Sequence, residues 1–426
     1  MLSDLILEKL QSLPSRYHWA LGDGQLLLAV YGNKPMVRTG RGARLGILVK
    51  LSQHFGMVWP LLTLVGMVEL IKLLLRQHVS VRNRSRKDGN YPARFFVGCG
   101  VPNDEKLFLR YSEKQSAGVG RLHQHKIESF AVWHRVGIMS GFRSLFYAVV
   151  VARMAIAALP AELASWRVDF LTHIGSKVGY VAYMRSWFDI LSIRAGIYLE
   201  EVVFTGQNMA AFAAVDVGIR AGYLQHGMIT RCEILPAFTS IMALTTSEAA
   251  FMRHRLPKAH VTMYSQSRQT LVPSQMAREI LIAACPAGYD VRYMLSVMPL
   301  VRWATTKKIP IRVRLHPSED DSCFWSSYEE AGLVTIEKDD VDFFQAIDRL
   351  RPRLLVSWVS ATLADVLECG VIPVSVSVDD DIHVAELVYP LFQRCLRWPK
   401  DFESIERLFD DDEYYASVLS RLRAGL

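Results

Sequence analysis

Residues 354–376, LLVSWVSATLADVLECGVIPVSV, contain the unit that decides the fold. Residues 354–357 are an apolar run typical of a buried strand, and residues 361–369 have the apolar spacing of a helix. Gly370 stands where helices commonly end in a left-handed glycine, and residues 371–376 are typical of the next strand. A strand, a helix and a strand in this order form a βαβ unit, which predicts a mostly parallel sheet.

Similar units recur along the chain from residue 91 onward. The other expected strands are residues 94–98, 201–205, 222–224, 241–245, 280–284 and 311–315. A polar stretch, residues 265–278, separates two blocks of strands and helices. We therefore predict an α/β protein with two Rossmann-like domains facing across a cleft, at residues 91–270 and 271–426.

The length and composition are consistent with two domains. The chain has 426 residues, of which 51% are apolar, and this is enough for two hydrophobic cores. Its six cysteines lack CxxC or CxH spacing, so neither a zinc site nor a disulfide framework is indicated. The first residues carry acidic groups and lack the long apolar core of a signal peptide. These features favour a cytoplasmic location.

The region before the first domain, residues 1–90, is basic and partly apolar. Residues 1–140 hold 20 Lys and Arg against 9 Asp and Glu, a net +11, whereas the remainder holds 29 against 33, a net −4. This asymmetry indicates either an anionic partner, such as a membrane, a nucleic acid or an anionic acceptor, or a solvated basic face. We expect the region to be helical, as part of the first domain or as an appended anchor.

Residues 59–75 form the most apolar stretch, and basic residues follow it between positions 76 and 87. A mostly apolar helix with a basic flank is typical of an interfacial anchor on an anionic membrane. A transmembrane span is disfavoured, because the run has only about 17 residues and contains Glu69 and Lys72. The alternative is that residues 54–75 pack inside the protein core.

The first candidate site is Arg314-Leu315-His316-Pro317. His316 would lie at the carboxyl end of a central strand, where open α/β sheets bind ligands. Its ring N–H suits a phosphate oxygen, and Arg314 or Arg312 would add positive charge. The alternative is a loop histidine that makes a local hydrogen bond.

The second candidate is the turn between the strand 354–357 and the following helix. Ser360 is the natural N-cap, and free N–H groups at a helix start bind anions. The hydroxyls of Ser357 and Thr362 are also suited to a phosphate oxygen. We expect this strand to be next to the one before His316, so that both turns share one phosphate. The alternative is that these residues only cap the helix.

The third candidate is Gln225-His226-Gly227, which follows a strand of the first domain. A neutral imidazole near pH 7 suits a general base that removes a proton from an acceptor hydroxyl. Gln225 and Gly227 would position the donor or acceptor, and Gly227 allows close backbone approach. The alternative is that His226 is a structural histidine bonded to nearby backbone.

In this order, QHG, RLHP and SWVSATLADVLECGVIPV resemble motifs of GT-B glycosyltransferases of bacterial surface-polysaccharide biosynthesis. The similar families are sialyl- and polysialyltransferases, capsule Kdo transferases and CDP-glycerol glycerophosphotransferases. The resemblance covers residues 195–400 and implies that His316, Ser357, Ser360 and Thr362 hold the phosphate of a cytidine nucleotide, with His226 as base. The chain departs from these families in having Gln225 where the glycerophosphotransferases have Trp, and in lacking a clear acidic pair before a glycine.

Asp104 and Glu105 are alternative candidates for the base, because they follow the expected strand 94–98 through a Gly/Pro loop; otherwise they belong to a solvated loop. The acidic runs 379–381 and 410–413 do not converge on a metal site, so we predict neither a metal nor a cofactor. A GT-B enzyme needs no metal where helix termini and basic side chains neutralise a leaving phosphate.

These observations predict a glycosyltransferase with a nucleotide-sugar donor, favouring a CMP-sugar, on the second domain. The acceptor would be a glycan or a lipid-linked acceptor of capsule or lipopolysaccharide assembly, entering over the first domain. The enzyme would be peripheral on the cytoplasmic face of the inner membrane. The alternatives are a CDP-polyol phosphotransferase of the same fold, a sugar-nucleotide epimerase and a non-enzymatic basic binding or scaffold protein. We expect no nucleic-acid partner, because the arginines at 82–86 follow an apolar helix.

Overall fold

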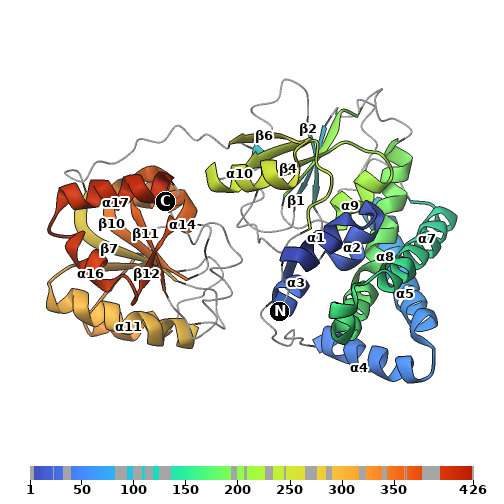
Figure 1. The fold of residues 1–426 in the computed structure, drawn as a ribbon, viewed down its shortest axis with the longest axis horizontal. Helices are drawn as coiled ribbons and strands as arrows, with labels where there is room; N and C mark the ends of the chain where they lie inside the picture. Colours follow the sequence, from blue (N-terminus) through green and yellow to red (C-terminus); the bar gives the residue numbers. More distant parts are fainter. Residues whose placement is uncertain are drawn as a thin grey trace. The chain divides into compact units, whose positions relative to one another are not determined.

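The computed structural model describes two compact units (Figure 1). The described residues are 4–22, 24–31, 40–81, 94–98, 108–109, 111, 119–123, 136–192, 199–205, 209–225, 234–243, 246–263, 276–284, 290–315, 323–337, 343–358, 360, 362–376 and 394–424. The units divide between Thr262 and Met263, apart from two short segments before that point. The division is eight residues before the expected boundary after residue 270.

The first unit contains a six-stranded sheet in the order β2-β1-β3-β4-β5-β6. Its strands are β1 (Arg94–Gly98), β2 (Val119–His123), β3 (Glu201–Thr205), β4 (Ala221–Leu224), β5 (Ser240–Ala243) and β6 (His260–Met263). The pairs from β2 through β5 are parallel. Strands β3 and β4 are buried along most of their length, as expected for a parallel sheet covered on both faces.

A large helical layer belongs to the same unit. It comprises α1 (Asp4–Ser12), η1 (Ser15–Tyr17), α2 (His18–Leu21), α3 (Gly24–Tyr31), α4 (Gly40–His54), α5 (Val58–Val81), α7 (Ile138–Ala157), η3 (Ala161–Trp166) and α8 (Arg167–Ser192). Helices α9 (Met209–Asp216) and α10 (Thr246–Arg255) follow β3 and β5. The described part of residues 1–90 is therefore helical and is part of the first unit.

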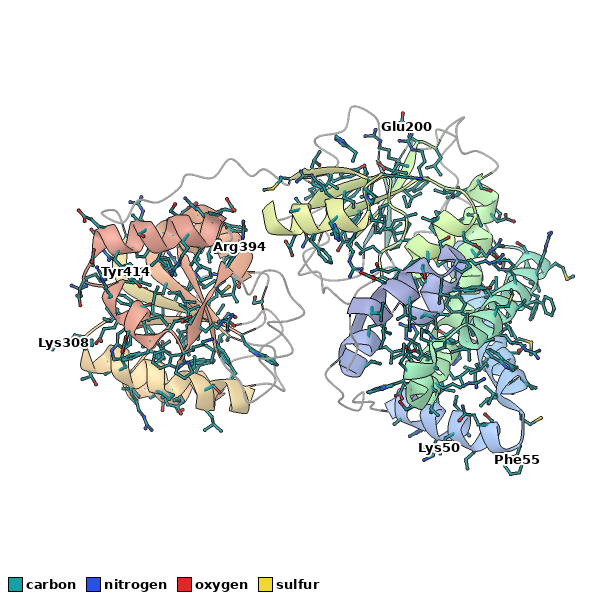
Figure 2. All side chains as sticks on the ribbon, viewed as in Figure 1. Lys50, Phe55, Glu200, Lys308, Arg394 and Tyr414 are labelled. Atoms are coloured by element: carbon teal, nitrogen blue, oxygen red, sulfur yellow. The ribbon has the colours of Figure 1, made fainter. Side chains whose placement is uncertain are left out.

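Helix α8 packs against α4, α5 and α7 (Figure 1, with side chains in Figure 2). Glycines allow the close approach of α5 and α8. A Cβ added at Gly179 would lie 2.6 Å from the Gly66 carbonyl oxygen, and one at Gly66 would lie 2.9 Å from Val178. One face of α5 therefore packs in the core of the first unit, which agrees with the alternative expected for residues 54–75.

The second unit contains another six-stranded sheet, in the order β12-β11-β10-β7-β8-β9. Its strands are β7 (Ala277–Ala283), β8 (Ile311–Arg314), β9 (Thr335–Ile336), β10 (Pro352–Ser357), β11 (Ile372–Val376) and β12 (Leu396–Trp398). All neighbouring strands are parallel. Numbered along the chain within this unit, the order is that of a Rossmann fold, with the first and fourth strands adjacent at the centre.

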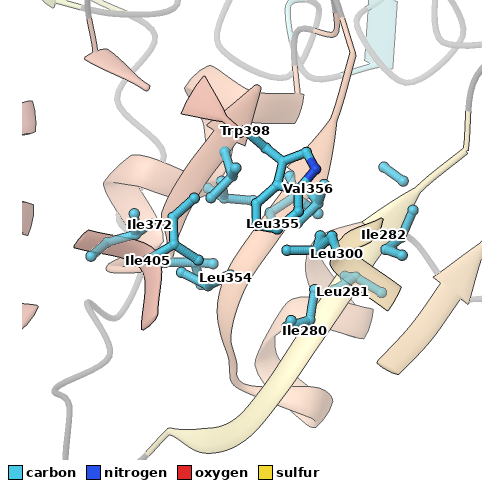
Figure 3. Packing of buried hydrophobic residues seen from close by; sticks show 14 of the residues in the cluster. Ile280, Leu281, Ile282, Leu300, Leu354, Leu355, Val356, Ile372, Trp398 and Ile405 are labelled. Carbon is cyan, nitrogen blue, oxygen red and sulfur yellow. The ribbon is translucent and has the colours of Figure 1, made fainter. Parts of the chain in front are cut away.

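Helices connect and cover these strands. They are α11 (Asp290–Thr306), α12 (Cys323–Glu330), α13 (Phe343–Leu350), α14 (Thr362–Cys369), α16 (Phe402–Arg407) and α17 (Asp412–Ala424). The core includes Leu281 of β7, Leu355 of β10, Leu300 of α11 and Trp398 of β12 (Figure 3). Gly370 ends α14 with a φ of 93°, as predicted. The two parallel sheets confirm the predicted α/β class with two Rossmann-like domains.

One buried histidine makes the first unit sensitive to acid. Burial lowers the pKa of His18 from its usual value of 6.5, and the ring packs edge-on against Phe212 at 6.3 Å. The imidazole of His18 therefore binds a proton less readily in the native state than in the unfolded chain. The free energy of unfolding is highest above pH 6.5 and falls as the pH drops toward the pKa of His18 in the native state.

We expect the melting temperature of the first unit to fall between about pH 7 and pH 5, and the fall to be smaller in His18→Gln. Thermal melts of both proteins across this range test the effect. The exposed His254→Gln is the matched control and should keep the wild-type slope. Equal slopes for His18→Gln and the wild type would contradict the assignment.

Candidate functional site

The candidate site is the carboxyl edge of the second-unit sheet, where β10, β7 and β8 end side by side. The chain runs outward from β7 through β8 to β9 and then returns to the other side of β7, where β10, β11 and β12 follow in order. The switch point of the sheet therefore lies between β7 and β10. Open α/β sheets bind their ligands at such a point. The expected direct contact between the strands before His316 and Ser357 is wrong, because β7 lies between β8 and β10. Both strands still end at the same edge.

Ser357 ends β10 with its side chain turned toward β7. The side chain is buried, and its hydroxyl donates a hydrogen bond to the carbonyl of Ala283 at 3.1 Å. The Tyr293 hydroxyl of α11 donates to the same carbonyl at 3.2 Å. The single hydroxyl hydrogen of Ser357 therefore connects two strands at the switch point, and it must leave this bond before it can donate to a ligand.

Ser360 and Thr362 cap the start of α14. The two hydroxyl oxygens lie 2.8 Å apart, and the Thr362 backbone N–H donates to the Ser360 hydroxyl at 3.3 Å. The backbone N–H of Leu363 donates to the carbonyl of Ser360. This is N-cap geometry, and it places the positive end of the helix dipole at the switch point. Two hydroxyls share one hydrogen bond here, so one hydroxyl hydrogen is left for a ligand within the described part of this turn.

Two arginines lie on one side of β8. Arg312 forms ion pairs with Glu279 at 2.6 Å and Glu337 at 3.9 Å, and burial raises the pKa of Glu279 despite that pairing. Its charge is therefore matched by carboxylates. Arg314 is half-buried at the last position of the strand, next to the site. Arg314 lies nearer the carboxyl edge of the sheet than Arg312, so it is the closer of the two to a ligand bound there. His316, two residues further, lies outside the described residues.

The first unit has its own switch point, between β1 and β3. Thr205 ends β3, and its buried hydroxyl donates to the Val97 carbonyl of β1 at 3.4 Å. Gln225 follows β4 and is fully buried, and its backbone N–H donates a hydrogen bond to the backbone carbonyl of Met242 at 3.0 Å. The proposed bases His226, Asp104 and Glu105, and also Gly227, lie outside the described residues.

The sequence did not single out Ala283, Tyr293 or Thr205 as part of a site. The strand 280–284 was expected, but its position between the strands before His316 and Ser357 was not. In the sequence, Tyr293 lies among apolar residues as an ordinary core residue of a helix does, and in the structure it is fully buried. A prediction that the second unit has Rossmann order would have placed the end of β7 at the centre of the site.

The acidic run 410–413 takes part in ion pairs with arginines. Asp410 contacts Arg278 at 2.6 Å, and Asp411 contacts Arg407 at 2.7 Å. Within the described ranges, no group of three His, Cys, Asp or Glu side chains is arranged to hold a metal ion. The other acidic run, 379–381, lies outside those ranges.

No protein-family model matches the sequence, and no curated protein matches it. Among solved structures, MurG of Acinetobacter baumannii is similar with 11% identity and a TM-score of 0.45, over 78% of this chain and 94% of that one. UDP-GlcNAc 2-epimerase of Neisseria meningitidis bound to UDP-GlcNAc is similar with 13% identity and a TM-score of 0.41, over 76% of this chain and 94% of that one. Accessory secretory protein 1, 2 and 3 of Streptococcus pneumoniae is similar with 7% identity and a TM-score of 0.37, over 58% of this chain and 54% of that chain. The match therefore spans about half the length of that protein. The fold assignment therefore rests on the strand orders of the two sheets.

Proposed function

We propose that this protein is a metal-independent glycosyltransferase that binds a nucleotide-sugar donor at the switch point of its second unit. The observation that carries the proposal is the position of the Ser360-capped helix α14 at the switch between β7 and β10. The positive end of a helix dipole favours an anionic group there.

The donor phosphate would be held from two sides. Ser360 and Thr362 would approach it from the end of β10, and Arg314 from the end of β8. We expect His316, which follows β8 by two residues in the sequence, to join Arg314 there. The mutual hydrogen bond of Ser360 and Thr362 leaves one hydroxyl hydrogen to donate, whereas the Ser357 hydrogen is directed to Ala283. We therefore expect Ser360 and Thr362 to contribute more to phosphate binding than Ser357.

In the proposed reaction the acceptor hydroxyl oxygen forms a bond to the anomeric carbon of the donor. The bond between that carbon and the phosphate oxygen breaks, and the nucleotide leaves with the electron pair. The hydroxyl proton passes to a base of the first unit, for which His226 is preferred and Asp104 and Glu105 are the alternatives. The α14 terminus and Arg314 would stabilise the negative charge of the leaving phosphate, so no cofactor is required.

We favour a CMP-sugar as donor and a glycan or lipid-linked acceptor of capsule or lipopolysaccharide assembly. This part of the proposal is supported by the order of the QHG, RLHP and Ser/Thr motifs in the sequence. Transfer of a polyol phosphate from a CDP-polyol would use the same anion site. Both reactions release CMP, and the modified acceptor distinguishes them: sugar transfer adds a sugar without phosphate, whereas phosphotransfer adds a polyol together with a phosphate.

The first test is a thermal-shift titration with CMP, CDP, UDP, GDP and ADP. A ligand that binds only the native state raises the melting temperature of the protein. At a ligand concentration of about 100 times its Kd, the free energy of unfolding increases by about 2.7 kcal/mol. We expect CMP or CDP to stabilise the wild type, and His316→Ala and Ser360→Ala to lose most of this shift. His260→Ala, an exposed histidine of the first unit, is the matched control and should keep the full shift.

Each other outcome is also informative. Stabilisation by UDP or GDP instead would keep a nucleotide-sugar enzyme but reject the cytidine donor. A well-folded protein that responds to no nucleotide would reject the enzymatic proposal and favour a scaffold. A cytidine response that persists in both variants would place the nucleotide elsewhere in the protein.

A further inference from the structure

Exposed apolar side chains concentrate on three helices of the first unit. Of the seventeen large apolar side chains that are exposed in the described part of the chain, fourteen belong to α4, the α4–α5 turn, α5 or α7. They are Ile47, Leu48, Leu51, Phe55, Met57, Leu64, Val68, Ile71, Leu75, Ile138, Met139, Phe146, Val150 and Met154. In the second unit the corresponding set contains only Leu295. Such a concentration marks a contact surface rather than scattered exposure.

The packing of the three helices turns these side chains outward together. Helices α4, α5 and α7 each pack against α8, and α5 also contacts both α4 and α7. On α5 the exposed residues Leu64, Val68, Ile71 and Leu75 follow the spacing of a single helix face. The buried face, with Leu62, Gly66 and Leu70, is turned to α7 and α8. We call the outward surface of α4, α5 and α7 the apolar face.

Positive charge accompanies the apolar face. The three helices contain seven basic residues and one acidic residue, Glu69. The basic residues are Arg41, Arg44, Lys50, Lys72, Arg76, Arg143 and Arg153. Six of them have described side chains, all exposed. A second copy docked through the same face would bring these like charges together, whereas an anionic surface would complement them.

The α4–α5 turn projects further apolar groups. Phe55 is 78% exposed and Met57 is 55% exposed, on either side of Gly56, which has a φ of 66°. Figure 2 shows Lys50 and Phe55 at the outer end of α4. A cavity of about 300 Å³ adjoins this turn and is lined by Gln53, Trp59 and Arg167 among others. Tryptophan with a nearby cation is typical of the boundary between acyl chains and headgroups.

Two of the helices are long and apolar enough to cross a membrane by length and composition, at Val58–Arg76 and Ile138–Ala157. Each of them buries one face against α8 and carries charges within the apolar run, Lys72 in α5 and Arg143 in α7. One buried face and charges within the apolar run are typical of helices that lie in the plane of the membrane–water interface, with long basic side chains reaching the headgroups.

We propose that the apolar face docks the first unit on an anionic lipid bilayer. The face extends the membrane contact expected for residues 54–75 to α4 and α7. It lies on helices that contribute none of the candidate donor-site residues, so the inference does not depend on the proposed function. A lipid bilayer fits this surface because its acyl chains complement the apolar side chains and its anionic headgroups complement the basic ones.

The test is co-sedimentation of the full-length protein with vesicles of phosphatidylcholine, either alone or with about a quarter phosphatidylglycerol. We expect binding to the anionic vesicles that weakens with salt. Phe55→Glu/Phe146→Glu should bind at least about tenfold more weakly. Leu295→Glu, the exposed leucine of the second unit, is the matched control and should bind as the wild type does.

A second pair of variants separates folding from binding. Arg143→Gln/Arg153→Gln removes two exposed cations and should weaken binding to anionic vesicles by about fivefold for each charge. Arg302→Gln, an exposed arginine of α11, should have no effect. The proposal is overturned if the folded wild type does not bind anionic vesicles, or if the variants bind as tightly as their controls. It is also overturned if the wild type self-associates without lipid and the Phe55/Phe146 variant is monomeric.

Discussion

Gly179→Val is expected to destabilise the first unit by about 3 kcal/mol, the upper end of the usual effect of overpacking a core. A Cβ at position 179 would meet the backbone oxygen of Gly66 and the Cβ of Glu69, both at 2.6 Å. Neither atom is the end of a flexible side chain, so relief requires α5 and α8 to move apart. That movement would also disturb the contacts of Gly66 with Leu145 and Val178.

Urea denaturation followed by circular dichroism measures the loss as a shift of the variant's unfolding curve from that of the wild type. The matched control is Ser176→Val, an exposed position on the same helix, which should change stability by less than about 0.5 kcal/mol. The close packing of α5 on α8 would be refuted if Gly179→Val were as stable as the control. The same variant should also weaken vesicle binding, because α5 forms the centre of the apolar face.

The α5 region illustrates what sequence patterns can and cannot predict. At the helical spacing of about 100° per residue, Gly66, Glu69, Lys72 and Arg76 share one narrow stripe of an otherwise mostly apolar helix. In the structure this stripe lies at the edge of the buried face: Gly66 is buried, whereas Lys72 and Arg76 are exposed. A glycine in a helix occurs both on a solvent-exposed polar face and at a close contact with another helix. The sequence of α5 alone cannot distinguish the two, because the contact depends on a helix distant in the sequence.

The strand order shows a similar limit in the second unit. Apolar runs and turn residues predicted the four central strands, β7, β8, β10 and β11, because burial on both faces of a parallel sheet leaves a continuous apolar pattern. The short edge strands β9 and β12 lack this pattern and were not predicted. Strand order depends on pairing between distant segments, and no local pattern encodes it. For this reason the insertion of β7 between β8 and β10 was missed, and with it the hydrogen bond that directs Ser357 to Ala283. Ser360 was predicted correctly as an N-cap because capping is local.

Leu355→Ala is expected to destabilise the second unit by about 3 kcal/mol, within the range for a buried leucine. Leu355 is fully buried in β10, and its in-register neighbours are Leu281 of β7 and Pro373 of β11 (Figure 3). The cavity left by the truncation would lie in the middle of the sheet, where strands on both sides prevent collapse. The exposed Leu295→Ala of the same unit is the control and should cost less than about 0.5 kcal/mol.

This variant also tests whether the two units unfold separately, since the first unit and the second have distinct cores. We expect Leu355→Ala to lower the unfolding transition that CMP or CDP raises, and to leave vesicle binding by the apolar face unchanged. Gly179→Val should have the opposite pattern, with weaker vesicle binding and an unchanged nucleotide response. If each variant instead lowered a single shared transition by the same amount, the two cores would unfold as one cooperative unit, and the separate unfolding expected here would be refuted.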